Sequence, residues 1–298
     1  MQLIKNTSID FIGKRKISFV ISGIVAIIGL IGIVQIAANM GIDFSGGTSV
    51  QLSFAQPVSL DKARELLAGH DLKEANLQEI KEGNRILVKI GKDRLAKGSV
   101  ADTITELFKK EFPGNAFVIE SSTEIGPSIG DKLKTDTLKA VGLSMIGIIL
   151  YIAWRFDFKF GIGAIVATLH DVLAMIALFY LMNKEINLLF ITAVLTIAGY
   201  SLTDTVVVFD RVRENLQKSL EGSSEAIFNR SINEVLSRTV VTSLTTFLAS
   251  VSLFLFGGEV IHDFALALVA GVVIATYSSI FIASPIVAQL EAGRGGAQ

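Results

Sequence analysis

The chain has 298 residues, of which 51% are hydrophobic and 18% charged, with a formal net charge of −1 and a mean hydropathy of +0.57. Water-soluble proteins carry about 25% charged residues, so this composition predicts an integral membrane protein. The absence of cysteine excludes disulfides, thiol catalysis, thiolate zinc and iron–sulfur sites, and only three histidines argue against a histidine metal cage. The near-zero net charge indicates no general attraction to nucleic acid, and the composition suggests no cofactor.

Six stretches are apolar and long enough to cross a membrane, which takes roughly 20 residues. They cover residues 17–38, 138–154, 160–182, 187–209, 240–256 and 264–288. Basic residues precede the first stretch, as in a signal peptide, but its 22-residue apolar core is longer than a signal-peptide core. We therefore predict a polytopic α-helical membrane protein with six transmembrane helices.

Residues 39–137, between the first two helices, read as a separate domain outside the membrane. The predicted order is strand 48–54, helix 59–68, strand 75–81, strand 85–90, helix 98–112 and strand 116–125. This is the order of a ferredoxin-like split βαβ unit. The other predicted regions are the N-terminus with the first helix (1–38), a five-helix domain (138–290) and a tail (291–298).

Basic residues in short loops predict the orientation, because such loops tend to stay cytoplasmic. They gather before the first helix, in residues 155–159 and in the loop 210–239, whereas the opposite short loops contain Lys184 alone. Both termini are therefore predicted to be cytoplasmic. Residues 210–237 read as an amphipathic segment lying on the inner membrane surface or, alternatively, as a simple positive-inside anchor.

An ionisable side chain within a span costs about 2.5–3.5 kcal/mol, so His170, Asp171 and Asp204 are candidates for function, and Arg238 at the cytoplasmic mouth of the fifth helix is considered as a partner of Asp204. Asp204 lies within the fourth helix, and the fifth helix carries a stripe of polar and small residues that starts at Arg238. The stripe has the spacing of a packed helix seam and consists of Arg238, Thr242, Thr245, Ala249 and Ser252. An ion pair or water-linked pair between Asp204 and Arg238 is one interpretation. The alternatives are that Asp204 only holds helices together and that Arg238 only anchors its helix.

His170 and Asp171 lie halfway along the third helix. Adjacent helical residues point about 100° apart, so one of the two is expected to face a cavity and the other to serve packing. A proton relay and a purely structural polar contact both remain open.

The glycine-rich segment after the first helix (GIDFSGGT, with Gly41, Asp43, Gly46 and Gly47) superficially resembles a phosphate-binding loop. It lacks the lysine and the glycine spacing of such a loop. We predict a tight, flexible hinge at the start of the outer domain. Gly199 and Ser201 in turn lack the second glycine and the base of a serine nucleophile, so no catalytic residue is predicted.

Four segments together resemble the SecD/SecF family, related membrane subunits that accompany the bacterial protein-export channel and a branch of the resistance-nodulation-division (RND) transporters. They are Gly41–Thr48, His170–Asp171, Gly199–Asn215 (GYSLTDTVVVFDRVREN) and Ser237–Thr246 (SRTVVTSLTT). The resemblance runs from about Ile9 to Ile286. An outer domain of about a hundred residues favours the SecF branch, because that of SecD is much larger.

The resemblance implies an accessory subunit of the Sec translocase that couples the proton motive force to late-stage polypeptide translocation across the inner membrane. It implies a SecD-like subunit, the SecYEG channel, YajC and translocating preproteins as partners, and proton passage at Asp204 and Arg238. Two other functions remain open from the residues alone: an RND-type half-transporter for lipids or small molecules, and a non-transporting assembly scaffold.

Overall fold

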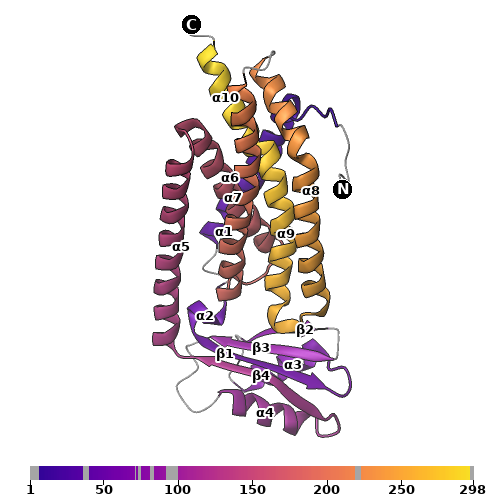
Figure 1. The fold of residues 1–298 in the computed structure, drawn as a ribbon. Helices are drawn as coiled ribbons and strands as arrows, with labels where there is room; N and C mark the ends of the chain where they lie inside the picture. The colour runs from indigo at the N-terminus through magenta and orange to yellow at the C-terminus, as the bar shows by residue number, and fades with distance from the viewer. Residues whose placement is uncertain are drawn as a thin grey trace. The chain divides into compact units, whose positions relative to one another are not determined.

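A computed structural model describes residues 7–35, 40–70, 72, 75–80, 84–91, 100–218 and 223–295. The predicted bounds at residues 36–38, 81, 98–99, 219–222 and 296–298 lie outside these ranges. The chain divides into two compact units (Figure 1). Unit 1 comprises residues 1–39 and 140–298, and unit 2 comprises residues 40–139.

Unit 2 is built around a four-stranded antiparallel sheet. Its elements are α2 (Ile42–Ser45), β1 (Gly47–Phe54), α3 (Leu60–Gly69), β2 (Asn76–Ile80), β3 (Arg85–Gly91), α4 (Val100–Glu111) and β4 (Phe117–Ile125). The strand order is β2-β3-β1-β4, so β1 is a central strand between β3 and β4. The predicted ferredoxin-like order of strands and helices is confirmed.

The core of unit 2 follows from the alternation of side chains along a strand. Val50, Leu52 and Phe54 of β1 point to one face, where they meet buried residues of β3. Ala63 and Leu67 of α3, with Ile104 and Phe108 of α4, complete this core. The two helices therefore cover one face of the sheet.

Among the described residues, six helices are long and apolar enough to span a membrane, as predicted. They are α1 (Arg15–Val34), α5 (Pro127–Arg155), α6 (Phe158–Leu181), α7 (Leu188–Gln217), α8 (Ser224–Phe256) and the continuous run of α9 (His262–Ser278), the π-helical turn η5 (Ser279–Ala283) and α10 (Ser284–Gly295). In unit 1, α6 is packed against α1, α7 and α9, and α8 is packed against α7 and α9. Gly29 permits close contact with α6, because a Cβ atom there would lie 2.4 Å from the Leu173 carbonyl oxygen.

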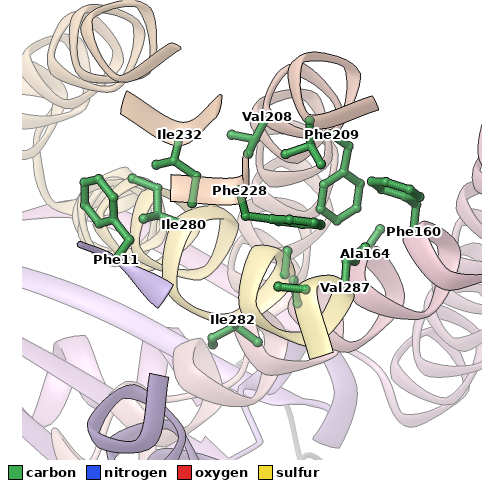
Figure 2. Packing of buried hydrophobic residues seen from close by; sticks show 14 of the residues in the cluster. Phe11, Phe160, Ala164, Val208, Phe209, Phe228, Ile232, Ile280, Ile282 and Val287 are labelled. Atoms are coloured by element: carbon green, nitrogen blue, oxygen red, sulfur yellow. The ribbon is translucent and has the colours of Figure 1, made fainter. Parts of the chain in front are cut away.

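Large apolar side chains fill one end of unit 1, where α6, α7, α8 and η5 meet (Figure 2). Phe209 of α7 packs edge-on against Phe160 of α6, with ring centroids 5.1 Å apart. Phe228 and Ile232 of α8 are fully buried in the same cluster.

The interpretation of residues 210–237 as a surface-lying segment is wrong for the described residues. α7 continues to Gln217 and α8 begins at Ser224, so the two form a helical hairpin. The apolar positions Phe228 and Ile232 face the cluster of Figure 2. Polar contacts hold the hairpin together, among them Asn215 to Ser231 at 2.9 Å and Arg211 to Glu234 at 2.6 Å.

The segment before α1 is fastened to this hairpin. The Asn233 side chain exchanges two hydrogen bonds with the Ile9 backbone, at 3.0 and 2.9 Å, and Asn229 accepts from the Phe11 and Ile12 amides. The Gly13 amide and the Asn229 side chain donate to Asp10, which lowers the pKa of this carboxyl. Phe11 and Ile12 can therefore enter the apolar cluster with their backbone groups satisfied.

Candidate functional site

Asp204 lies on α7 with its carboxylate held from two other elements. The Thr239 hydroxyl of α8 donates to Oδ1 at 2.9 Å, and the Ser279 hydroxyl, at the start of η5, donates to Oδ2 at 2.6 Å. Asp204 is only 9% exposed, and Thr239 and Ser279 are buried. Three segments far apart in the sequence thus converge on this carboxylate.

Asp171 on α6 is a second buried carboxylate. Its Oδ2 accepts a hydrogen bond from Ser201 of α7 at 2.5 Å, and its Oδ1 lies 3.3 Å from Nδ1 of His170. The Ser278 side chain also interacts with this carboxylate. The other ring nitrogen of His170, Nε2, is buried and has no hydrogen-bond partner among the described residues.

These buried polar residues come from α6, α7, α8, α9 and η5, and we call them the inner cluster. Its members are His170, Asp171, Ser201, Asp204, Thr239, Ser278 and Ser279. Both halves of the predicted His170–Asp171 pair are buried in it. Within the described residues, no group of three or more histidine or acidic side chains could hold a metal ion.

Arg238 does not reach Asp204 directly. Its side chain is exposed, and among the described residues it forms no ion pair. It acts on Asp204 through Coulomb attraction, whereas its neighbour Thr239 makes the hydrogen bond. The interpretation of a direct ion pair is therefore not supported.

The stripe predicted as a packed seam on α8 faces outward. All of its residues are exposed, and they continue a similar exposed row on α7. Together these residues form what we call the outer stripe: Thr192, Thr196, Gly199, Thr203, Arg238, Thr242, Thr245, Ala249 and Ser252. Several threonines satisfy their hydroxyls on their own helix, such as Thr242 on the Arg238 carbonyl at 3.0 Å.

The face of α8 that packs inside unit 1 is the next row of small polar residues. Thr239 bonds Asp204, and Ser243 accepts hydrogen bonds from Tyr200 of α7 at 3.3 Å and Thr276 of α9 at 2.7 Å. The sequence reading missed Thr239, Ser201, Ser278 and Ser279. The available signal was a second helical row, from Thr239 through Ser243 to Ser250, one position along from the predicted stripe.

The hydroxyls around Asp204 suit a group that changes its protonation state. An ionised carboxylate only accepts hydrogen bonds, a protonated one also donates, and a hydroxyl can rotate to serve as donor or acceptor. The site therefore tolerates gain or loss of a proton at Asp204 without leaving a buried polar group unpaired.

The glycine segment is a one-turn helix that leads directly into the sheet. Gly41 precedes α2, Asp43 lies in its first turn, and Gly46 ends it with φ of 70°. Gly47 has φ of 144° and opens β1, and a Cβ atom there would lie 2.3 Å from the Ile90 carbonyl oxygen. Tight packing and positive φ account for the two glycines, and a hinge motion stays a prediction.

The chain is a multi-pass helical membrane protein with a small α+β domain. It belongs to the SecD/SecF family: residues 103–293 match the family described as protein export membrane protein SecD/SecF, C-terminal, and residues 37–58 match the SecD/SecF GG motif.

Several relatives are similar over nearly the whole chain. The protein translocase subunit SecF of Thermodesulfovibrio yellowstonii is 52% identical, over 96% of each chain. That of Calditerrivibrio nitroreducens is 42% identical, also over 96% of each chain. The crystal structure of SecDF from Thermus thermophilus, described as a translocon-associated membrane protein, matches with a TM-score of 0.85 and 34% identity; the match covers 98% of this chain and 40% of that one.

Proposed function

We propose that the chain is an accessory subunit of the Sec protein-export translocase and couples the proton motive force to late-stage polypeptide translocation. It would work in the bacterial inner membrane with both termini cytoplasmic, beside a SecD-like subunit, SecYEG and YajC. Relatives named protein translocase subunit SecF support this role, as does the similarity to a translocon-associated SecDF.

The observation that carries the proton-coupling part is the environment of Asp204. A carboxylate deep in a membrane unit, with hydroxyl donors from α8 and η5, can alternate between charged and neutral forms. One charge crossing 100 mV releases about 2.3 kcal/mol, enough to bias a two-state movement. Protonation of Asp204 is proposed to drive such a movement while polypeptide emerges.

The outer stripe is proposed to face the SecD-like subunit. An exposed guanidinium on a membrane-spanning helix is costly in lipid, so Arg238 needs a protein neighbour or a wet cavity. Small and hydroxyl-bearing residues allow close approach of a partner helix. The chain accounts for only 40% of the matching SecDF chain, which leaves room for such a partner.

The experiment is proton-dependent export into membrane vesicles that contain the SecD-like subunit and the channel. Asp204→Asn is expected to assemble normally and to lose the proton-dependent part of export, because the amide has nearly the same shape but cannot titrate. The matched control is Asp263→Asn, which removes a half-exposed carboxylate paired with Lys184 at 2.8 Å. This control is expected to keep export.

Arg238→Lys provides a second arm of the same assay. Because Arg238 makes no direct bond to Asp204, its charge should suffice and the lysine variant should keep most of the export. Full export by Asp204→Asn would instead favour a non-transporting scaffold.

A further inference from the structure

The two buried carboxylates of the inner cluster are linked by serines on two different segments. On α7, Ser201 donates to Asp171 and lies one helical turn before Asp204. On the α9–η5 run, Ser278 interacts with Asp171, and the next residue, Ser279, donates to Asp204 at 2.6 Å. The α7 segment therefore carries Asp204 and contacts Asp171, and the α9–η5 run contacts both carboxylates.

The geometry of Ser278 and Ser279 explains how neighbours in sequence reach carboxylates on different helices. Consecutive helical residues point about 100° apart, so Ser278 can face α6 while Ser279 faces α7. The π-helical turn begins at this position, and Ser284 donates to the Ser279 carbonyl at 2.9 Å. π-Turns within α-helices are frequent at functional sites.

Nothing in the isolated role of Asp204 requires this second carboxylate. Asp171 is 1% exposed, and His170 beside it carries a buried nitrogen without a partner in the described part of the chain. Buried polar atoms left unpaired are rare and call for an explanation. A role for His170 as a proton acceptor or donor at this end of the cluster explains the unpaired nitrogen.

We propose that Asp171 and Asp204 form one coupled pair that shares a proton through the hydroxyls of Ser201, Ser278 and Ser279, with His170 at its end. When the proton leaves Asp204 toward Asp171, each hydroxyl along the route accepts one proton and donates the proton that it already carried. Asp204 becomes charged and Asp171 neutral, so the pair keeps one negative charge and no serine is left ionised. The inference rests on the proposed proton-coupling role of Asp204 and adds a second site for the same proton.

The other ionisable groups around the pair come from three helices. They are His170 on α6, Tyr277 of α9, whose ring centroid lies 6.1 Å from that of His170, and Arg238 on α8, which acts on Asp204 at longer range. Groups that interact strongly titrate as a unit and not singly.

The test is an infrared titration of carboxyl protonation in the full-length protein, assembled with its SecD-like partner in lipid vesicles. Bands are assigned with Asp171→Asn and Asp204→Asn. For a coupled pair, replacing Asp204 shifts the titration midpoint of Asp171 by about one pH unit or more, and replacing Asp171 shifts that of Asp204 equally, because thermodynamic coupling is reciprocal.

Serine variants test the link itself. Ser279→Ala removes a donor to Asp204 alone, yet it is expected to move the midpoints of both carboxyls, and its effect on Asp171 should disappear when residue 204 is asparagine. Thr239→Val removes the other donor to Asp204 from α8 and should behave alike, which covers a folding failure of the first variant. The control is Ser250→Ala, a buried serine about 16 Å further along α8 than Thr239, which should move neither midpoint.

An Asp171 midpoint that is the same in the wild type and in Asp204→Asn overturns the coupling. This result is independent of export: loss of proton-dependent export in Asp204→Asn with no shift at Asp171 would leave the proposed function standing. A shifted Asp171 midpoint together with normal export in Asp204→Asn would support the coupling and overturn the proposed function.

Discussion

The inner cluster and the outer stripe are both rich in serine or threonine and differ in what surrounds these hydroxyls. Carboxylates of the inner cluster receive hydroxyl donors from neighbouring helices of the same chain. The outer stripe has threonines bonded to their own helix and an arginine that remains exposed. The carboxylates of the inner cluster find hydroxyl donors within the chain, whereas Arg238 of the outer stripe has no ion-pair partner among the described residues. The position of a hydroxyl on its helix therefore decides whether it bonds a carboxylate of another helix or a carbonyl of its own.

The largest expected effect comes from the contrast between the α1–α6 contact inside unit 1 and the exposed outer stripe. A Cβ atom at Gly29 would meet the Leu173 backbone at 2.4 Å, whereas one at Gly199, on the outer stripe, meets nothing within 4 Å. Gly29→Ala should lower the free energy of unfolding in mixed micelles by about 1–3 kcal/mol, since α1 and α6 must separate. Gly199→Ala should be neutral or stabilising by up to about 1 kcal/mol. An equal loss of unfolding free energy in Gly29→Ala and Gly199→Ala would contradict the distinction between the packed helix contact and the outer stripe.

A matched pair of threonines compares the polar groups themselves. Thr239→Val removes a buried donor to Asp204 and should cost about 1 kcal/mol, the scale of an interhelical hydrogen bond in a membrane protein. Thr245→Val removes a hydroxyl of the outer stripe, whose hydrogen bond goes to Thr242 of its own helix, and should change stability by less than about 0.5 kcal/mol. Both are measured by unfolding of the isolated chain. A larger loss at Thr245 would mean that the outer stripe supports the fold.

The smallest expected effect on stability is that of a crosslinker placed on the outer stripe, which reports instead on contact with the partner subunit. Because the chain has no cysteine, a photo-crosslinker can be attached to a single cysteine at Thr245. Unfolding of the isolated chain should stay within about 0.5 kcal/mol, and illumination of the complex should join the chain to the SecD-like subunit. The control is a cysteine at Leu143, an apolar residue of α5 that is 72% exposed. Equal adducts from both positions would argue against the outer stripe as the contact face.

The order of elements could be predicted because local patterns determine it. Alternation along 48–54 and 85–90 marked strands that share a core, and six apolar runs marked the long helices. Helix ends were less accurate at 210–239, where apolar residues such as Phe228 pack into the protein and not onto a membrane surface. The helical spacing of apolar residues does not reveal whether that face of the helix packs against lipid or against protein.

The contacts of Asp204 could be predicted only in part. The cost of a carboxylate in a membrane marked Asp204 and Asp171 as important, and the structure buries both. Their serine partners gave no comparable signal, because serine is cheap to place in a membrane helix. The prediction that the stripe on α8 packs inside the bundle was wrong. Rows of small and polar residues also occur at contacts between chains, so spacing alone could not tell whether Arg238 and Thr242 face the bundle or its outside.

The pairing of Gly47 with Ile125 has a mechanical consequence for unit 2. The chain reaches the sheet through α2 and Gly47 and leaves it after Ile125, and these two residues are opposite each other on neighbouring strands. Tension between the two connections is therefore carried at one corner, by β1 and β4, and need not pass through the apolar core.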